Sequence, residues 1–170
     1  MIWSSKTEPS CAAAERRRLR PVPFPFLIAL AVLTIGGVQA APRDGSAMRF
    51  PSGATFVLEI AVSDEDRGLG YMFRPEIPAD EGMLFVMGRV DRHGFWMKNC
   101  LTALDIIWLD EEYTVVHIEE RVPPCPPEGE CPLVRPMQAA SYVLEVAPGR
   151  AAEENLAVGD RLERIPGAQP

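Results

Sequence analysis

Histidine and cysteine are scarce in this chain, which has two histidines and four cysteines among 170 residues. Cys125 and Cys131 are separated by five residues, whereas familiar zinc sites space two cysteines by about two to four. The chain also lacks a Gly-x-Ser-x-Gly nucleophile elbow, a phosphate-cradling glycine loop and a His-Glu-x-x-His pair. We therefore expect no metal and no cofactor, and the hydrolases and nucleotide-binding proteins that depend on these motifs are excluded.

Positive charge is also scarce beyond the N-terminal segment. Residues 1–40 hold five basic and two acidic side chains, so the rest of the chain keeps 17 − 5 = 12 basic and 24 − 2 = 22 acidic ones, a net charge of −10. Such a surface repels phosphate backbones and anionic lipids, and no basic stripe with interleaved aromatic residues is present. We expect no nucleic-acid partner, membrane contact only through the N-terminal segment, and a monomer.

The first 40 residues have the pattern of a secretory signal peptide. Four arginines within residues 16–20 precede an apolar stretch at 24–35, and Val38-Gln39-Ala40 supplies small residues before Ala41. The apolar stretch is shorter than the ~20 residues of a membrane-spanning helix, so a retained anchor is the less favoured alternative. We expect cleavage before Ala41 and a periplasmic or secreted protein.

Short apolar stretches separated by proline, glycine and acidic turns predict a mostly β fold with one or two short helices. Residues 41–53 are expected to be a flexible lead and residues 54–166 a single globular domain, a compact β sandwich or barrel. The proline-rich segment 122–136 is expected to be a loop. Strands are expected at 54–62, 83–87, 94–98, 104–109, 113–120, 142–146 and 158–165, with short helices after Ser63 and at 150–156.

Two segments nearly repeat each other: Val57-Leu58-Glu59-Ile60-Ala61 and Val143-Leu144-Glu145-Val146-Ala147. They are either two amphipathic strands of similar pattern or the starts of two pseudo-symmetric β–α halves. In both interpretations Glu59 and Glu145 point away from the Leu/Ile/Val face. We expect both glutamates to be solvated or paired with arginine, and not catalytic.

Five motifs follow one another along the chain. They are Arg67 with Gly70-Tyr71-Met72-Phe73-Arg74, Asp80 to Phe85, Phe95-Trp96-Met97-Lys98-Asn99, Leu104-Asp105-Ile106-Ile107, and Val143 to Val146 with Gly149 and Gly159-Asp160. With these motifs the chain resembles, from about Phe56 to Ile165, the bacterial and archaeal family called domain of unknown function 192. The resemblance implies a jelly-roll-like β fold, often behind a signal peptide, and no established activity or ligand. Cys100 stands where the family usually has Thr, and Ala103 where Pro is common.

One cluster of polar and aromatic residues is unusual for a plain core strand. An aromatic pair, a cation and an amide stand together in Phe95-Trp96-Met97-Lys98-Asn99, and Asp105 follows at the start of an apolar strand. Buried charges are rare unless they are paired. We hypothesise a small ligand-binding or accessory module of the cell envelope, whose polar pocket takes a sugar or a small anion. The lining we expect is Arg67, Arg74, Trp96, Lys98, Asn99 and Asp105.

Two other interpretations stay open. The same cations can pair with Glu81, Asp105 and Glu59 only to fix loops, which predicts a purely structural or interaction domain. Alternatively, Asp105 and Glu81 can act as acid and base in a hydrolase of envelope polysaccharide, because glycosidases need two carboxyl groups at a suitable separation.

An oxidising compartment favours a disulfide between Cys125 and Cys131, which bracket a short Pro/Gly loop. Cys100 is then unpaired. We expect it to be a buried thiol, with a reactive thiol beside Lys98 or a bond to Cys125 or Cys131 as alternatives.

Mass spectrometry of the protein recovered from its own cell envelope tests both the cleavage and the disulfide. We expect a denatured mass that begins at Ala41 and lacks the two hydrogens lost on forming one disulfide. A mass that includes residues 1–40 contradicts cleavage, and a fully reduced mass contradicts the disulfide.

Overall fold

The computed structural model describes residues 43–167, so the predicted signal peptide at 1–40 lies outside the described residues. None of the helices in this part of the chain has the length and apolar character that crossing a bilayer requires. The elements, in chain order, are β1 (Ala47–Arg49), β2 (Thr55–Ala61), α1 (Asp64–Leu69), β3 (Glu81–Asp91), β4 (Phe95–Trp96), β5 (Leu104–Leu109), β6 (Val115–Val122), β7 (Leu133–Val134), β8 (Ala140–Val146), α2 (Arg150–Glu153) and β9 (Glu163–Ile165).

Seven strands form one mixed sheet in the order β6-β5-β8-β3-β2-β1-β9, and β4 and β7 form a separate two-stranded ribbon. β2 and β3 are parallel, joined through α1, and the other neighbours are antiparallel. The mostly β class with two short helices is confirmed. A jelly-roll-like sandwich is not confirmed, because the main strands share a single sheet rather than forming two packed ones.

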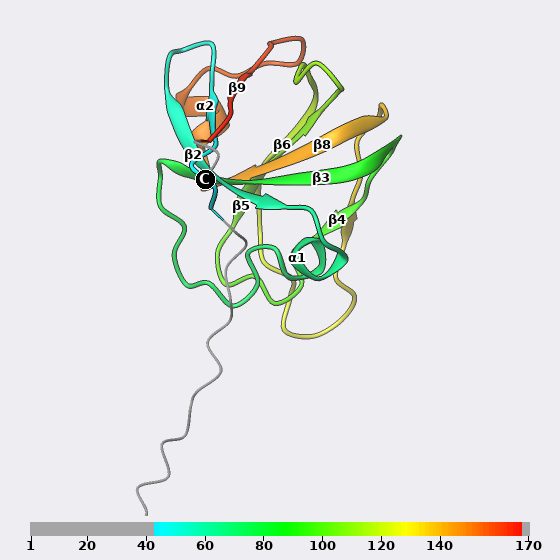
Figure 1. Cartoon of the computed structure of the whole chain (residues 1–170). Coiled ribbons are helices and arrows are strands. Elements are labelled where there is room, and N and C mark those ends of the chain that lie inside the picture. The colour runs from blue at the N-terminus through cyan, green and yellow to red at the C-terminus, as the bar shows by residue number, and fades with distance from the viewer. Residues whose placement is uncertain (1–42, 168–170) are drawn as a thin grey trace, which may run out of the picture. The chain divides into compact units, whose positions relative to one another are not determined.

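Both faces of this sheet are covered, and each carries its own apolar cluster. On the α1 face, Met83, Phe85, Ile106 and Trp108 pack with Tyr71 from the turn after α1. On the α2 face, the cluster contains Phe56, Leu58, Leu84, Ile107, Leu144, Ala151 and Leu156. α1 and β4 lie on one side of the β3–β8 layer, and α2 lies on the other (Figure 1). Strand side chains alternate between the two faces, so all of β5 and all of β8 except Tyr142 are buried. β3 is buried over residues 82–85.

The segment expected to be a flexible lead, 41–53, instead enters the sheet from Ala47 onward, which corrects the predicted domain start at 54. β1 pairs with both β2 and β9. Met48 and Phe50 are buried, and the Phe50 ring lies 4.5 Å from that of Phe56. A three-residue strand is too short to show a periodic pattern, so its place depends on partners that are distant in the chain.

The local signals around Ser63 agree with the structure. The Ser63 hydroxyl accepts a hydrogen bond from the Asp66 amide at 3.0 Å and caps α1, and Gly70 ends the helix with φ 48°. Ser at this position satisfies one of the unpaired amides of the first turn. Other predicted elements are shorter than expected: β4, α2 and β9 cover only parts of 94–98, 150–156 and 158–165.

Asp105 is a buried structural hub between β5, β6 and α2. One carboxylate oxygen accepts the amides of Arg121 at 2.8 Å and Gly149 at 2.9 Å, and the other accepts the Ala151 amide at 2.8 Å. The side chain is fully buried. A buried carboxylate with three amide donors is satisfied by the backbone, so Asp105 joins the start of α2 to the sheet.

Replacing Asp105 by alanine is expected to destabilise the fold by about 3 kcal/mol, because three buried amides lose their acceptor. Urea unfolding of Asp105→Ala measures this loss. The exposed substitution Glu65→Ala is the matched control and is expected to stay within about 0.5 kcal/mol of wild type. Equal midpoints for the two variants would contradict the structural role of Asp105.

Candidate functional site

Two glutamates share one cross-strand row on the α1 face of the sheet. Glu59 of β2 pairs with Met83 of β3, which pairs with Glu145 of β8. Side chains of paired residues point to the same face. The two nearly repeated segments therefore place their glutamates on one face, with Met83 between them.

Glu59 is neutralised by arginines. Its carboxylate receives hydrogen bonds from the two terminal guanidinium nitrogens of Arg74, at 2.6 and 2.7 Å, and one from Arg43 at 2.9 Å. Burial by itself raises the pKa of Glu59, but the hydrogen bonds from Arg74 and then Arg43 outweigh it and hold the pKa below its usual value. Glu59 is thus an ionised carboxylate enclosed by cations, as the sequence allowed.

Glu145 has the opposite environment. Its side chain is 5% exposed, and within residues 43–167 no hydrogen bond or ion pair reaches its carboxyl group. Burial raises its pKa to about 8, so the carboxyl group carries its proton at neutral pH. The expectation that Glu145 is solvated or paired with arginine is wrong, because α1 and β4 cover this face of β8.

A pocket of about 130 Å³ opens onto Glu145. The buried Tyr71 hydroxyl, in the turn that lines this pocket, has no hydrogen-bond partner among the residues that the structure describes. Gly70 passes close over the floor: a side chain there would meet Phe85 at 3.3 Å and Glu145 at 3.8 Å, and φ 48° disfavours other residues. The lining residues are Arg67, Gly68, Leu69, Gly70, Tyr71, Met72, Phe85, Met87, Gly94, Phe95, Trp96, Cys100 and Glu145.

Aromatic contacts hold one wall of the Glu145 pocket in place. The Phe95 ring meets Phe85 edge to face at 5.0 Å and Trp108 at 6.1 Å. Trp108 is buried and donates its indole N–H to the His93 carbonyl at 2.9 Å. Such edge-to-face pairs favour a defined geometry. β4 is therefore anchored by Phe95, and its neighbour Trp96 is left half-exposed.

Of the predicted ligand residues, Arg67 and Trp96 line the Glu145 pocket and Arg74 does not. Arg67 pairs with Asp64 and donates to the carbonyls of Val62 and Val86. Arg74 binds Glu59, and its guanidinium lies 4.9 Å from the Tyr71 ring centre. Both arginines are engaged within the protein.

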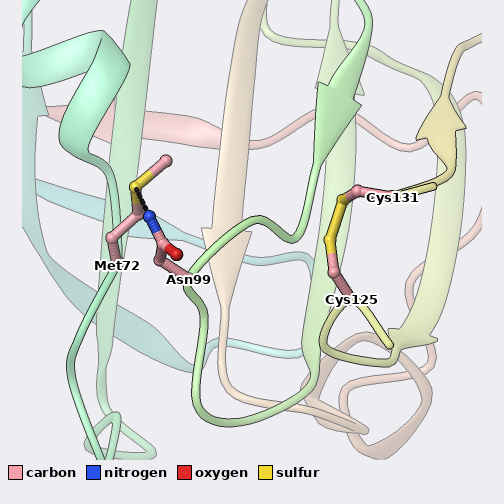
Figure 2. The surroundings of a disulfide bond; sticks show 4 residues. All are labelled: Met72, Asn99, Cys125 and Cys131. Carbon is pink, nitrogen blue, oxygen red and sulfur yellow. Dashed lines mark hydrogen bonds between the residues drawn. A yellow bond between two sulfur atoms is a disulfide. The ribbon is translucent and has the colours of Figure 1, made fainter. Parts of the chain in front are cut away.

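Lys98 and Asn99 line a second depression together with Trp96. The Lys98 ammonium lies 5.3 Å from the centre of the Trp96 ring. The Asn99 amide is turned toward Met72 and away from the Cys125–Cys131 disulfide (Figure 2), and it donates to the Met72 sulfur at 3.6 Å. Asn99 thereby joins its own loop to the turn after α1.

Asp105 and Glu81 are not brought together. Asp105 is aligned with Val146 and Gly82, on the α2 face, whereas Glu81 precedes Gly82 and points to the α1 face. Glu81 is paired with Arg43 at 2.8 Å and 2.5 Å. An acid–base pair needs both carboxyl groups at one substrate, so this geometry does not support a hydrolase that uses these two residues.

The cysteines follow the favoured sequence interpretation in part. Cys125 is bonded to Cys131, with Cα atoms 5.0 Å apart, and Cys100 is a half-buried thiol. Burial and then the neighbouring Glu145 raise the pKa of Cys100 to about 11, so it is not a thiolate at neutral pH. Residues 43–167 contain no group of three or more His, Cys, Asp or Glu side chains placed to bind a metal.

Sequence reasoning missed Glu145 and Tyr71 as site residues. The only available signal was the near repeat, in which an acidic residue interrupts two apolar strands. That pattern is typical of a strand with one solvated face, and the covering of that face by α1 and β4 involves residues far away in the chain.

The chain belongs to the DUF192 family, described as "Uncharacterized ACR, COG1430", whose sequence profile matches residues 48–164. A solved structure from Sinorhizobium meliloti 1021, described as a "putative transcription regulator", is similar at 28% identity and a TM-score of 0.65. The match covers 75% of this chain and 98% of that one. A protein of unknown function from Novosphingobium aromaticivorans is similar at 30% identity, covering 78% and 91%, with a TM-score of 0.63. No curated protein matches the chain.

The raised pKa of Glu145 predicts a pH-dependent stability. Below about pH 4.5 the residue is protonated in the folded and unfolded chain alike. Between about pH 4.5 and 8 only the unfolded chain releases the proton, so the folded protein loses stability as pH rises. Relative to wild type, Glu145→Gln is expected to gain roughly 4 kcal/mol over this range. Urea unfolding at several pH values, with Glu65→Gln as control, measures the difference. Parallel curves for wild type and Glu145→Gln would show that Glu145 ionises normally.

Proposed function

We propose that this protein is a binding module for a small neutral polar ligand, a single sugar unit, held in the Glu145 pocket. The observation that carries the proposal is a buried carboxyl group without a partner in an aromatic pocket. Buried polar groups are normally satisfied, and a carboxyl group with a strongly perturbed pKa in a pocket is a candidate for function.

The chemistry of the pocket suits hydroxyl groups. A protonated Glu145 offers one donor and one acceptor. Phe85, Phe95 and Trp96 supply apolar surface for the C–H face of a sugar ring. Of the two ligand classes that the sequence suggested, this favours a sugar over a small anion. An anion here would face a carboxyl group, while Arg67 is already bound to Asp64 and to two carbonyls.

The size of the pocket admits a sugar ring only in part. Its volume is about 130 Å³, and a cavity of about 150 Å³ is known to admit benzene, which is smaller than a hexose. The rest of the ring, and any further unit of a longer ligand, therefore has to lie past the rim.

Export to the cell envelope is part of the proposal and is supported by the N-terminal sequence pattern and by the Cys125–Cys131 bond. The similar structure from Sinorhizobium meliloti is described as a "putative transcription regulator". Nucleic-acid binding is not favoured for this chain, because residues 41–170 carry ten more acidic than basic side chains.

Titration of the ¹⁵N-labelled protein with glucose, galactose and N-acetylglucosamine tests this proposal. We expect at least one of these sugars to bind in the millimolar range and to shift the amide signals of Gly70, Tyr71 and Trp96. Glu145→Leu keeps the pocket wall but removes both hydrogen-bonding atoms, and it is expected to weaken binding about tenfold or more.

Glu65→Leu is the matched control, since it makes the same change on an exposed position of α1 and should bind as wild type. Absence of shifts with all three sugars, or equal binding by Glu145→Leu, would refute the proposed function.

A further inference from the structure

A second depression adjoins the Glu145 pocket. This groove has a volume of about 630 Å³ and shares two lining residues, Trp96 and Cys100, with the pocket. Its other lining residues are Lys98, Asn99, Cys125, Pro126, Pro127, Gly129, Glu130 and Cys131. We call it the disulfide-loop groove. A molecule that leaves the Glu145 pocket past Trp96 enters this groove directly.

Trp96 stands at the boundary between the two depressions. It is 50% exposed and pairs across the β4–β7 ribbon with Leu133, which is also about half-exposed. The strand that carries it is held in place, because Phe95 beside it is anchored in the core by Phe85 and Trp108. A preformed, half-exposed aromatic surface is what stacking of a ring-shaped ligand requires.

The groove differs from the Glu145 pocket in charge. Lys98 is the one lysine in residues 41–170, and its ammonium lies above Trp96 with no carboxylate within 4.0 Å in the described part of the chain. The other charged lining residue is Glu130, which is exposed on the loop between the bonded cysteines. Lys98 is thus a cation directed at the aromatic surface and left available to an anion.

We propose that the disulfide-loop groove is a second subsite, which binds the anionic unit of an acidic saccharide whose neutral neighbour occupies the Glu145 pocket. The acidic unit lies beyond Trp96 in the groove, and its carboxylate pairs with Lys98. The Cys125–Cys131 bond holds the opposite wall of the groove. This inference rests on the proposed function, because the neutral unit uses the Glu145 pocket.

Cellobiose and cellobiouronic acid are matched probes, since they differ only in the oxidation of one CH₂OH group to a carboxylate. We expect wild type to bind cellobiouronic acid about fivefold more tightly than cellobiose at low ionic strength, the range of an exposed ion pair. The preference should disappear in Lys98→Met and at high salt. Isothermal calorimetry and amide shifts at Trp96 and Lys98 provide the two readouts.

Arg49→Met is the control, because it removes one positive charge from β1, where Arg49 pairs with Glu163, and should keep the preference. Binding of cellobiose with no preference for the acid, or a preference retained in Lys98→Met, overturns the second subsite and leaves the proposed function intact. Binding of neither disaccharide, together with no binding of glucose, galactose or N-acetylglucosamine, overturns both.

Discussion

The constraint on which the rest of this structure depends is that its central strands are covered on both faces. β3 and β8 lie in the middle of a seven-stranded sheet, with an apolar cluster on each side. Alternating side chains on such strands are buried whatever their polarity. Glu145 of β8 therefore has no route to solvent, except where the covering layer of α1 and β4 leaves a gap.

The two glutamates of the shared row show how the covering layer decides their chemistry. Glu59 lies toward the edge of the sheet, where Arg74 and Arg43 reach it and keep it ionised. Glu145 lies one strand beyond Met83, below Gly70 and Phe95. No arginine of residues 43–167 reaches its carboxyl group, and burial keeps that group protonated. The same residue type in the same local pattern thus forms a structural ion pair at one position and the floor of a pocket at the other.

Asp105 illustrates the converse. It stands next to the polar cluster in the sequence, but its strand directs it to the opposite face, where three amides of the β6 and α2 segments bind it. The α2 face is in this way occupied by a structural carboxylate, whereas Glu145 and Tyr71 lie on the α1 face. The Glu145 pocket and the adjoining groove both lie at the α1–β4 side.

The sequence by itself determined much of the local structure: the capped helix after Ser63, the strand at 104–109, the short helices and the pairing of Cys125 with Cys131. These features depend on neighbouring residues, through capping, alternation and loop length. Of the residues that the sequence proposed for ligand binding, Arg67, Trp96, Lys98 and Asn99 line the two depressions.

Only the tertiary structure decided which of the charged residues are engaged and which are available. The strand at 47–49, the burial of Glu145, the unpartnered Tyr71 hydroxyl and the separation of Asp105 from Glu81 all depend on contacts between distant segments. The strand register across β2, β3, β8 and β5 places each side chain on one face of the sheet. The residue pattern within one segment specifies neither that register nor the layer that covers the face.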